Sequence, residues 1–190
     1  MNKAIAASTL SFGKASQLRS GFWPHASWLN WPIRSKAETP VNSDFSDLLQ
    51  SLNDAGADYL VVGGLAVIVH TEPRYTKDLD IWIDNSRPNA EKVFRALGKF
   101  GAPLDEVTVE DFTLPGLVYQ IGVEPTRIDI LMSLDEMEFA DCWPRRVPEI
   151  FDGVSMNLIS IADLVENKER TGRPQDLIDA ANLRKKLANY

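Results

Sequence analysis

The stretch of sequence that decides the fold is TKDLDIWI, residues 76–83. Its apolar odd-numbered positions form one face of a half-buried strand, and Asp78 and Asp80 lie on the other face, about 7 Å apart along the strand. Two carboxylates aimed at one place repel each other unless a cation lies between them, and Mg²⁺ prefers oxygen ligands of this kind. The stretch predicts either a metal site or a solvated strand face. Trp82, in phase with the aspartates, would either stack on a base or pack in the core.

A second buried strand precedes this one and ends on two glycines. Residues 59–62 read YLVV, Gly63 and Gly64 follow, and residues 65–70 favour a short helix. Glycines at such a point let the backbone approach a phosphate, and a helix start offers unbonded N–H groups and a partial positive charge. The alternative is a tight turn from strand to helix that holds no ligand.

A third acidic residue lies in a later apolar strand, RIDIL, residues 127–131. An unpaired carboxylate is costly in such surroundings. Asp129 therefore either pairs with Arg127, two positions earlier on the same face, or joins Asp78 and Asp80 as a third carboxylate of one site.

The remaining patterns complete an α/β (α+β) domain with a mixed, twisted sheet flanked by helices and closed by a helical pair. An apolar stripe predicts a helix from Ser43 to Gly56, and Asn85 or Ser86 opens another before Pro88. The sequence Asp152-Gly153 predicts a tight hairpin turn. Further strands are expected at 117–121, 127–132, 148–151 and 154–158, and the closing helices at 161–170 and 175–187.

Charge divides the chain into an extension, residues 1–41, and a single domain, residues 42–187. The extension has a net charge of +4, which leaves −11 for the remainder of a chain of net charge −7. It also contains Trp23, Trp28 and Trp31, is interrupted by three prolines, and has no regular period. We expect a partner-binding tail, a segment draped on the domain, or an upstream start of the reading frame.

The composition excludes several classes of protein. A net charge of −7 argues against a protein that coats nucleic acid by charge alone. The single cysteine, Cys142, excludes an internal disulfide and a zinc site made of cysteines, and it fits a cytoplasmic protein. No apolar run reaches the roughly 20 residues of a membrane span, so no membrane association is expected.

The combination of VVGGLA at 61–66, RYTKDLD at 74–80 and RID at 127–129 resembles the minimal nucleotidyltransferase superfamily. It is more closely similar to the AbiEii-type toxin branch and its uncharacterised relatives, over residues 42–187. The resemblance implies a nucleotidyltransferase fold. It also implies that Gly63 and Gly64 hold the triphosphate, and that Asp78 and Asp80 bind two metal ions together with Asp129, which acts on the incoming hydroxyl. Many active members have serine where this chain has Gly64.

The resemblance extends to ENKER, residues 166–170, and RPQD, residues 173–176. It implies that Lys168 and Asp176 complete the nucleotide site. Asp176 has a simpler alternative, because a carboxylate is favourable in a first helical turn. Before the two aspartates, Arg74 either contacts the nucleotide or is surface charge, and Thr76 can orient the loop by a side-chain hydrogen bond.

These features predict a Mg²⁺- or Mn²⁺-dependent enzyme that transfers a nucleoside monophosphate from an NTP to a hydroxyl of tRNA or of a protein. The resemblance to toxins implies a toxin of a toxin–antitoxin pair, with a cognate antitoxin as partner. One alternative is an antibiotic nucleotidyltransferase, since an acidic chain suits a cationic drug. Another is a non-catalytic nucleotide- or partner-binding module, which the Gly63-Gly64 variant favours.

Overall fold

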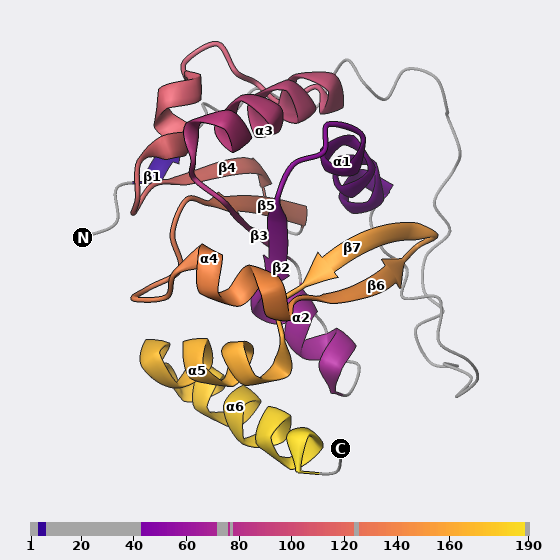
Figure 1. Cartoon of the computed structure of the whole chain (residues 1–190), viewed down its shortest axis with the longest axis vertical. Helices are drawn as coiled ribbons and strands as arrows, with labels where there is room; N and C mark the ends of the chain where they lie inside the picture. Colours follow the sequence, from indigo (N-terminus) through magenta and orange to yellow (C-terminus); the bar gives the residue numbers. More distant parts are fainter. Residues whose placement is uncertain (1–3, 7–42, 72–75, 77, 124–125, 189–190) are drawn as a thin grey trace.

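The computed structural model describes residues 4–6, 43–71, 76, 78–123 and 126–188. Its centre is a mixed sheet of seven strands in the order β1-β4-β5-β3-β2-β7-β6 (Figure 1). The strands are β1 (Ala4–Ala6), β2 (Tyr59–Val62), β3 (Asp78–Ile83), β4 (Val118–Val123), β5 (Thr126–Leu131), β6 (Val147–Phe151) and β7 (Val154–Leu158).

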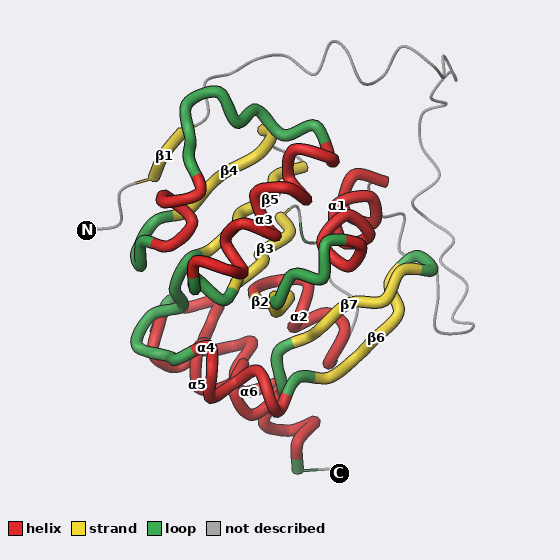
Figure 2. Tube along the Cα trace, turned by 45° about the horizontal axis from the view of Figure 1, so that its top comes forward, coloured by secondary structure: helices red, strands yellow, loops and turns green. Residues whose placement is uncertain are grey.

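The helices form two groups on opposite sides of the strands. In both Figure 1 and Figure 2, α1 and α3 lie together on one side, and α4, α5 and α6 lie together on the other. The helices are α1 (Ser43–Asp54), α2 (Gly63–His70), α3 (Arg87–Phe100), α4 (Phe139–Cys142), α5 (Ile161–Thr171) and α6 (Pro174–Leu187), with 3-10 turns η1 (Val109–Thr113) and η2 (Trp143–Arg145). The α/β architecture with its C-terminal helical pair confirms the fold predicted from the sequence.

Strand β3 lies between β2, which is antiparallel to it, and β5, which is parallel. Its apolar face, Leu79, Ile81 and Ile83, is completely buried. On the opposite face Trp82 is 1% exposed and packs edge-on against Phe139 of α4, with ring centroids 5.2 Å apart. Trp82 is therefore a core residue and does not offer a stacking surface.

The local signals of the sequence place most element ends correctly. Gly101 ends α3 in the left-handed conformation, and Ser86 precedes its first residue. Asp152 and Gly153 both have positive φ, 48° and 80°, as the two-residue turn between β6 and β7 requires. Helix α2 begins at Gly63, two residues earlier than the sequence predicts, so the glycines form the helix start itself.

The extension enters the described structure at one place, where residues 4–6 pair with β4 in parallel and form the edge of the sheet. Trp23, Trp28, Trp31 and Arg74 lie outside the described residues. Within the described residues, none of the helices combines the length and the apolar character needed to cross a bilayer.

Candidate active site

The register of two parallel strands brings the predicted carboxylates together. Asp80 on β3 lies directly beside Asp129 on β5, and Asp78 lies beside Arg127. Side chains in register on neighbouring strands share a face. Asp78, Asp80 and Asp129 therefore occupy one face of the sheet, as the sequence predicts for a common site.

Arg127 occupies the space between two of these carboxylates. Its Nη2 donates to Asp78 Oδ2 over 3.0 Å, and its Nε lies 3.2 Å from the Asp129 carboxylate. Gln120, on β4, donates from Nε2 to Asp129 Oδ1 over 2.9 Å. Asp129 thus pairs with Arg127, as one alternative drawn from the sequence has it, and it also lies beside Asp80, while its role as the third carboxylate of one site stays a prediction.

The arrangement destabilises the charged form of Asp80. Burial raises its pKa to about 6, and the negative charges of Asp129 and Asp78 add to the effect, while Lys168 and a hydrogen bond from the Gly64 backbone N–H oppose it. A carboxyl group whose pKa rises next to other carboxylates lies in a field of excess negative charge. A bound cation would relieve that excess.

Gly63 makes the position of Asp80 possible. It adopts φ +62°, and a Cβ added to it would overlap the Asp80 carboxylate. Glycine is thus required at this position for two reasons: the backbone is left-handed, and a side chain would overlap the Asp80 carboxylate. The first turn of α2 lies against Asp80, and the Gly64 N–H is directed at that carboxylate.

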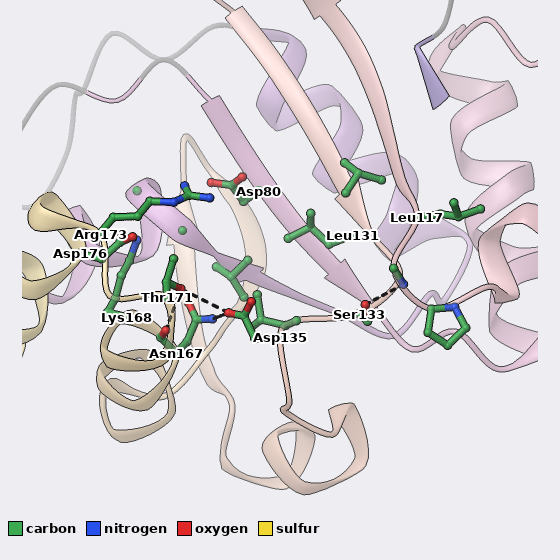
Figure 3. Close-up of a pocket in the computed structure, with 17 residues that line it drawn as sticks. Asp80, Leu117, Leu131, Ser133, Asp135, Asn167, Lys168, Thr171, Arg173 and Asp176 are labelled. Atoms are coloured by element: carbon green, nitrogen blue, oxygen red, sulfur yellow. Dashed lines mark hydrogen bonds and ion pairs between the residues drawn. The ribbon is translucent and has the colours of Figure 1, made fainter. Parts of the chain in front are cut away.

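A cleft of about 550 Å³ opens beside Asp80 (Figure 3). One part is polar, with Gly63 and Gly64 from α2 and with side chains from α5, α6 and their connection. The other part is largely apolar and follows the start of β4 and the end of β5. Its lining residues are Val62, Gly63, Gly64, Asp80, Pro115, Gly116, Leu117, Val118, Leu131, Ser133, Leu134, Asp135, Asn167, Lys168, Thr171, Arg173 and Asp176.

Lys168 and Asp176 form an ion pair in the polar part of the cleft. Lys168 Nζ donates to Asp176 Oδ1 over 2.6 Å, and the two residues are only 9% and 6% exposed. The second oxygen, Asp176 Oδ2, is buried and has no hydrogen-bond partner among the described residues. In Figure 3, the guanidinium of Arg173 points towards Asp80. Lys168 and Asp176 therefore both line the cleft, and their part in nucleotide binding stays a prediction.

Other residues named from the sequence have local explanations. Thr76 Oγ1 lies 3.4 Å from the backbone oxygen of Asp78, which agrees with an orienting role for the loop. Cys142 is buried, and burial raises the pKa of its thiol to about 11, so it is an unreactive core residue.

Two contributors, Gln120 and Arg173, were missed by the sequence analysis as site residues. Arg173 lay within a motif quoted for its resemblance, so its basic charge beside a helix start was a usable signal. No local pattern identifies Gln120, because its contact with Asp129 depends on the pairing of β4 with β5.

By its family, the protein is a nucleotidyltransferase. The chain belongs to the family described as nucleotidyltransferase of unknown function (DUF6036), whose sequence model matches residues 41–187. This confirms the predicted superfamily and enzyme class, while closeness to the AbiEii-type toxins stays a prediction.

Two solved structures are similar to this chain, and the first of them shares its fold. One is the lincosamide antibiotic adenylyltransferase LnuA bound to lincomycin, with 18% identity, a TM-score of 0.50, and coverage of 76% of this chain and 96% of that one. The other is ANT(2″)-Ia in complex with adenylyl-2″-tobramycin, with 15% identity, a TM-score of 0.46, and coverage of 74% and 85%. A comparison with curated proteins finds no match.

The face of the sheet that carries Asp78, Asp80 and Asp129 offers the oxygen ligands that a divalent cation prefers. These oxygens do not surround a common point in this structure. Among the described residues, no group of three or more acidic, histidine or cysteine side chains is close enough to hold an ion as it stands. Burial and the neighbouring carboxylates raise the pKa of Asp80 to about 6, and hard divalent ions prefer carboxylate oxygens as ligands. Arg127 takes up the contacts of Asp78 and Asp129 that a cation would otherwise use.

Proposed function

We propose that this protein transfers a nucleoside monophosphate from an NTP to a hydroxyl group, with Mg²⁺ or Mn²⁺ as cofactor. The observation that carries the proposal is the in-register placement of Asp80 and Asp129 beside a cleft that also holds Lys168 and Arg173. Carboxylates supply the ligands for a divalent ion, and the basic groups suit the phosphates of the nucleotide.

In this reaction a bond forms between the acceptor oxygen and the α-phosphorus. The bond from that phosphorus to the bridging oxygen breaks, and pyrophosphate leaves. Asp129 orients the acceptor hydroxyl and receives its proton. Asp78 and Asp80, together with Asp129, would hold the divalent ion, which when bound would polarise the phosphate and stabilise the leaving group.

The polar part of the cleft binds the triphosphate. Lys168 and Arg173 neutralise phosphate oxygens, and the first turn of α2 at Gly63 and Gly64 offers its backbone to them. Asp176 holds the Lys168 ammonium in place and keeps one oxygen for a donor group of the nucleotide. Thr76 steadies the loop before β3, and Arg74 is assigned to the nucleotide by resemblance.

The acceptor is a hydroxyl of tRNA or of a protein, which accords with a cytoplasmic toxin kept inactive by a cognate antitoxin. A second candidate is a small antibiotic-like acceptor. The apolar part of the cleft favours it, because Leu117, Val118 and Leu131 beside Asp80 offer a surface for a compact organic molecule. The solved LnuA structure, an adenylyltransferase bound to lincomycin, gives one example of such a molecule.

The test is transfer of label from each α-³²P-labelled NTP, with Mg²⁺ or Mn²⁺, to bulk tRNA, to protein, or to lincosamides and aminoglycosides. We expect label on one acceptor class and release of pyrophosphate, both absent from the Asp80→Asn protein. NTP binding without transfer to any acceptor would favour the non-catalytic module, and failure to bind NTP at all would overturn the proposal.

A further inference from the structure

Arg127 is a basic side chain fixed inside the carboxylate cluster. The register of β3 with β5 places it beside Asp78, and its position two residues before Asp129 puts it on the same face. It contacts both carboxylates through different nitrogens, at 3.0 Å and 3.2 Å, and its side chain is only 29% exposed. A guanidinium held at two points in this way is a specific neutralising charge, which differs from a mobile surface arginine.

The oxygens that Arg127 occupies are the ones that a divalent ion would need. Mg²⁺ takes its ligands at about 2.0–2.1 Å, and a guanidinium bonded to Asp78 Oδ2 and to the Asp129 carboxylate covers part of the approach to them. Two cations at one place also repel each other. A divalent ion bound by Asp78 and Asp129 together would therefore compete with Arg127 in its present position.

Gln120 makes an exchange of cations feasible. It donates to Asp129 Oδ1, whereas Arg127 contacts the same carboxylate through Nε. Because Gln120 is neutral, it can hold the orientation of Asp129 after the guanidinium has moved away. Asp80 accepts its hydrogen bond from Gly64 and depends on neither of these side chains.

We propose that Arg127 is a built-in counter-cation, which holds Asp78 and Asp129 together in the metal-free protein and leaves this position when a divalent ion binds. The inference rests on the metal-dependent function proposed above. Arg127 acts through the two carboxylates and is a positioning residue. It would keep the cluster folded without metal and set the concentration at which metal enters.

The experiment measures the affinity of the full-length protein for Mn²⁺ alone, by isothermal titration and by the Mn²⁺ electron paramagnetic resonance signal. The Arg127→Gln protein is expected to bind Mn²⁺ at least about tenfold more tightly than the wild type, the equivalent of losing one charge-assisted competitor. Its melting temperature without metal should fall, and saturating Mn²⁺ should raise that temperature more than it does for the wild type.

Two further variants separate charge from general damage. Arg145→Gln removes a comparable arginine–aspartate pair, Arg145 with Asp163 at 2.6 Å, away from the cluster. It should lower stability but leave the Mn²⁺ affinity at the wild-type value. Gln120→Leu removes the neutral hydrogen bond of Asp129 and should not tighten Mn²⁺ binding. The Nε–Hε nuclear magnetic resonance signal of Arg127 in the wild type should shift as Mg²⁺ is added, which gives a readout even if Arg127→Gln does not fold.

The outcomes distinguish this inference from the proposed function. Equal or weaker Mn²⁺ affinity in Arg127→Gln, or an Arg127 signal unaffected by saturating Mg²⁺, would overturn the exchange while leaving metal-dependent transfer intact. Absence of Mn²⁺ binding by every variant, with and without NTP, would overturn both.

Discussion

Two ionic clusters lie beside the cleft, one on the sheet and one on the helices, and they differ in their balance of charge. The cluster on the sheet has three carboxylates and one arginine, and burial, to which the charges of Asp129 and Asp78 add, raises the pKa of Asp80 to about 6. The cluster on the helices is a one-to-one pair, Lys168 with Asp176, at 2.6 Å. The first cluster is short of positive charge and is suited to a metal ion. The second is already neutral, so a phosphate must share its lysine with an aspartate.

The largest effect is expected at Asp80. Replacing it with asparagine should lower transfer by at least about a thousandfold, since a metal ligand contributes several kcal/mol to the transition state. The metal-free protein should meanwhile become more stable at neutral pH, because the substitution removes a charge that is buried beside like charges. Single-turnover transfer and chemical unfolding of the same two proteins measure both effects. A variant with wild-type transfer would refute the role of Asp80.

The pH dependence of that stability gain checks its cause. Because the pKa of Asp80 is raised, the folded protein keeps a proton that the unfolded chain releases near pH 4. The wild type should therefore lose on the order of 2–3 kcal/mol relative to Asp80→Asn as pH rises from about 4 to above 6. The pH-dependent part of this difference in unfolding free energy between the two proteins should vanish below pH 4. A constant difference across this range would show that charge is not its origin.

The cluster on the sheet could be predicted better than the cluster on the helices, because the side chains of a strand alternate between its two faces. Alternation alone put Asp78 and Asp80 on one face and Asp129 on the polar face of its own strand. What alternation could not supply is the strand order. Arg127 comes between Asp78 and Asp129 only because β5 lies next to β3, which is a pairing between residues about 50 positions apart.

The second prediction concerns the helical pair. Lys168→Met leaves the Asp176 carboxylate buried without its partner, which should cost about 3–5 kcal/mol of stability. NTP binding should weaken by about ten- to a hundredfold, since a charge-assisted contact to phosphate is lost. The double variant Lys168→Met/Asp176→Leu should regain most of the stability and none of the affinity. Recovery of NTP binding in the double variant would make the pair purely structural.

The sequence alone could place Lys168 on the inner face of α5, because it follows Leu164 and Val165 at helical spacing. The structure agrees, since all three residues are buried. It could not identify the partner of Lys168. That pairing depends on the path between α5 and α6, which turns at Gly172 with φ 66°. Helix α6 also departs from the usual pattern, since Asp176 is buried with Leu183 while Ile178 is exposed, so its apolar residues alone do not identify its inner face.

The third prediction tests the contact that holds Asp80 in place. Gly63→Ala forces a left-handed backbone on alanine, at about 1–3 kcal/mol, and adds an overlap with the Asp80 carboxylate. Gly56→Ala is a matched control, because Gly56 has nearly the same φ, +63°, with open space around it. Unfolding of both variants should show a larger loss for Gly63→Ala. The additional loss in Gly63→Ala should become smaller when Asp80 is also replaced by alanine. Equal losses for Gly63→Ala and Gly56→Ala, with and without Asp80, would mean that the contact does not affect stability.

The smallest effect is expected from the extension, whose described residues, 4–6, form the sheet edge remote from β3 in strand order. Deleting residues 1–41 removes the three residues of β1 from their pairing with β4 and should change the unfolding free energy by less than about 1 kcal/mol. Ile5→Pro in the full chain isolates this pairing, because proline cannot donate to the ladder. Thermal unfolding of both proteins gives the comparison. If Ile5→Pro is harmless but the deletion costs several kcal/mol, other parts of the extension stabilise the domain, and the boundary at residue 42 is wrong.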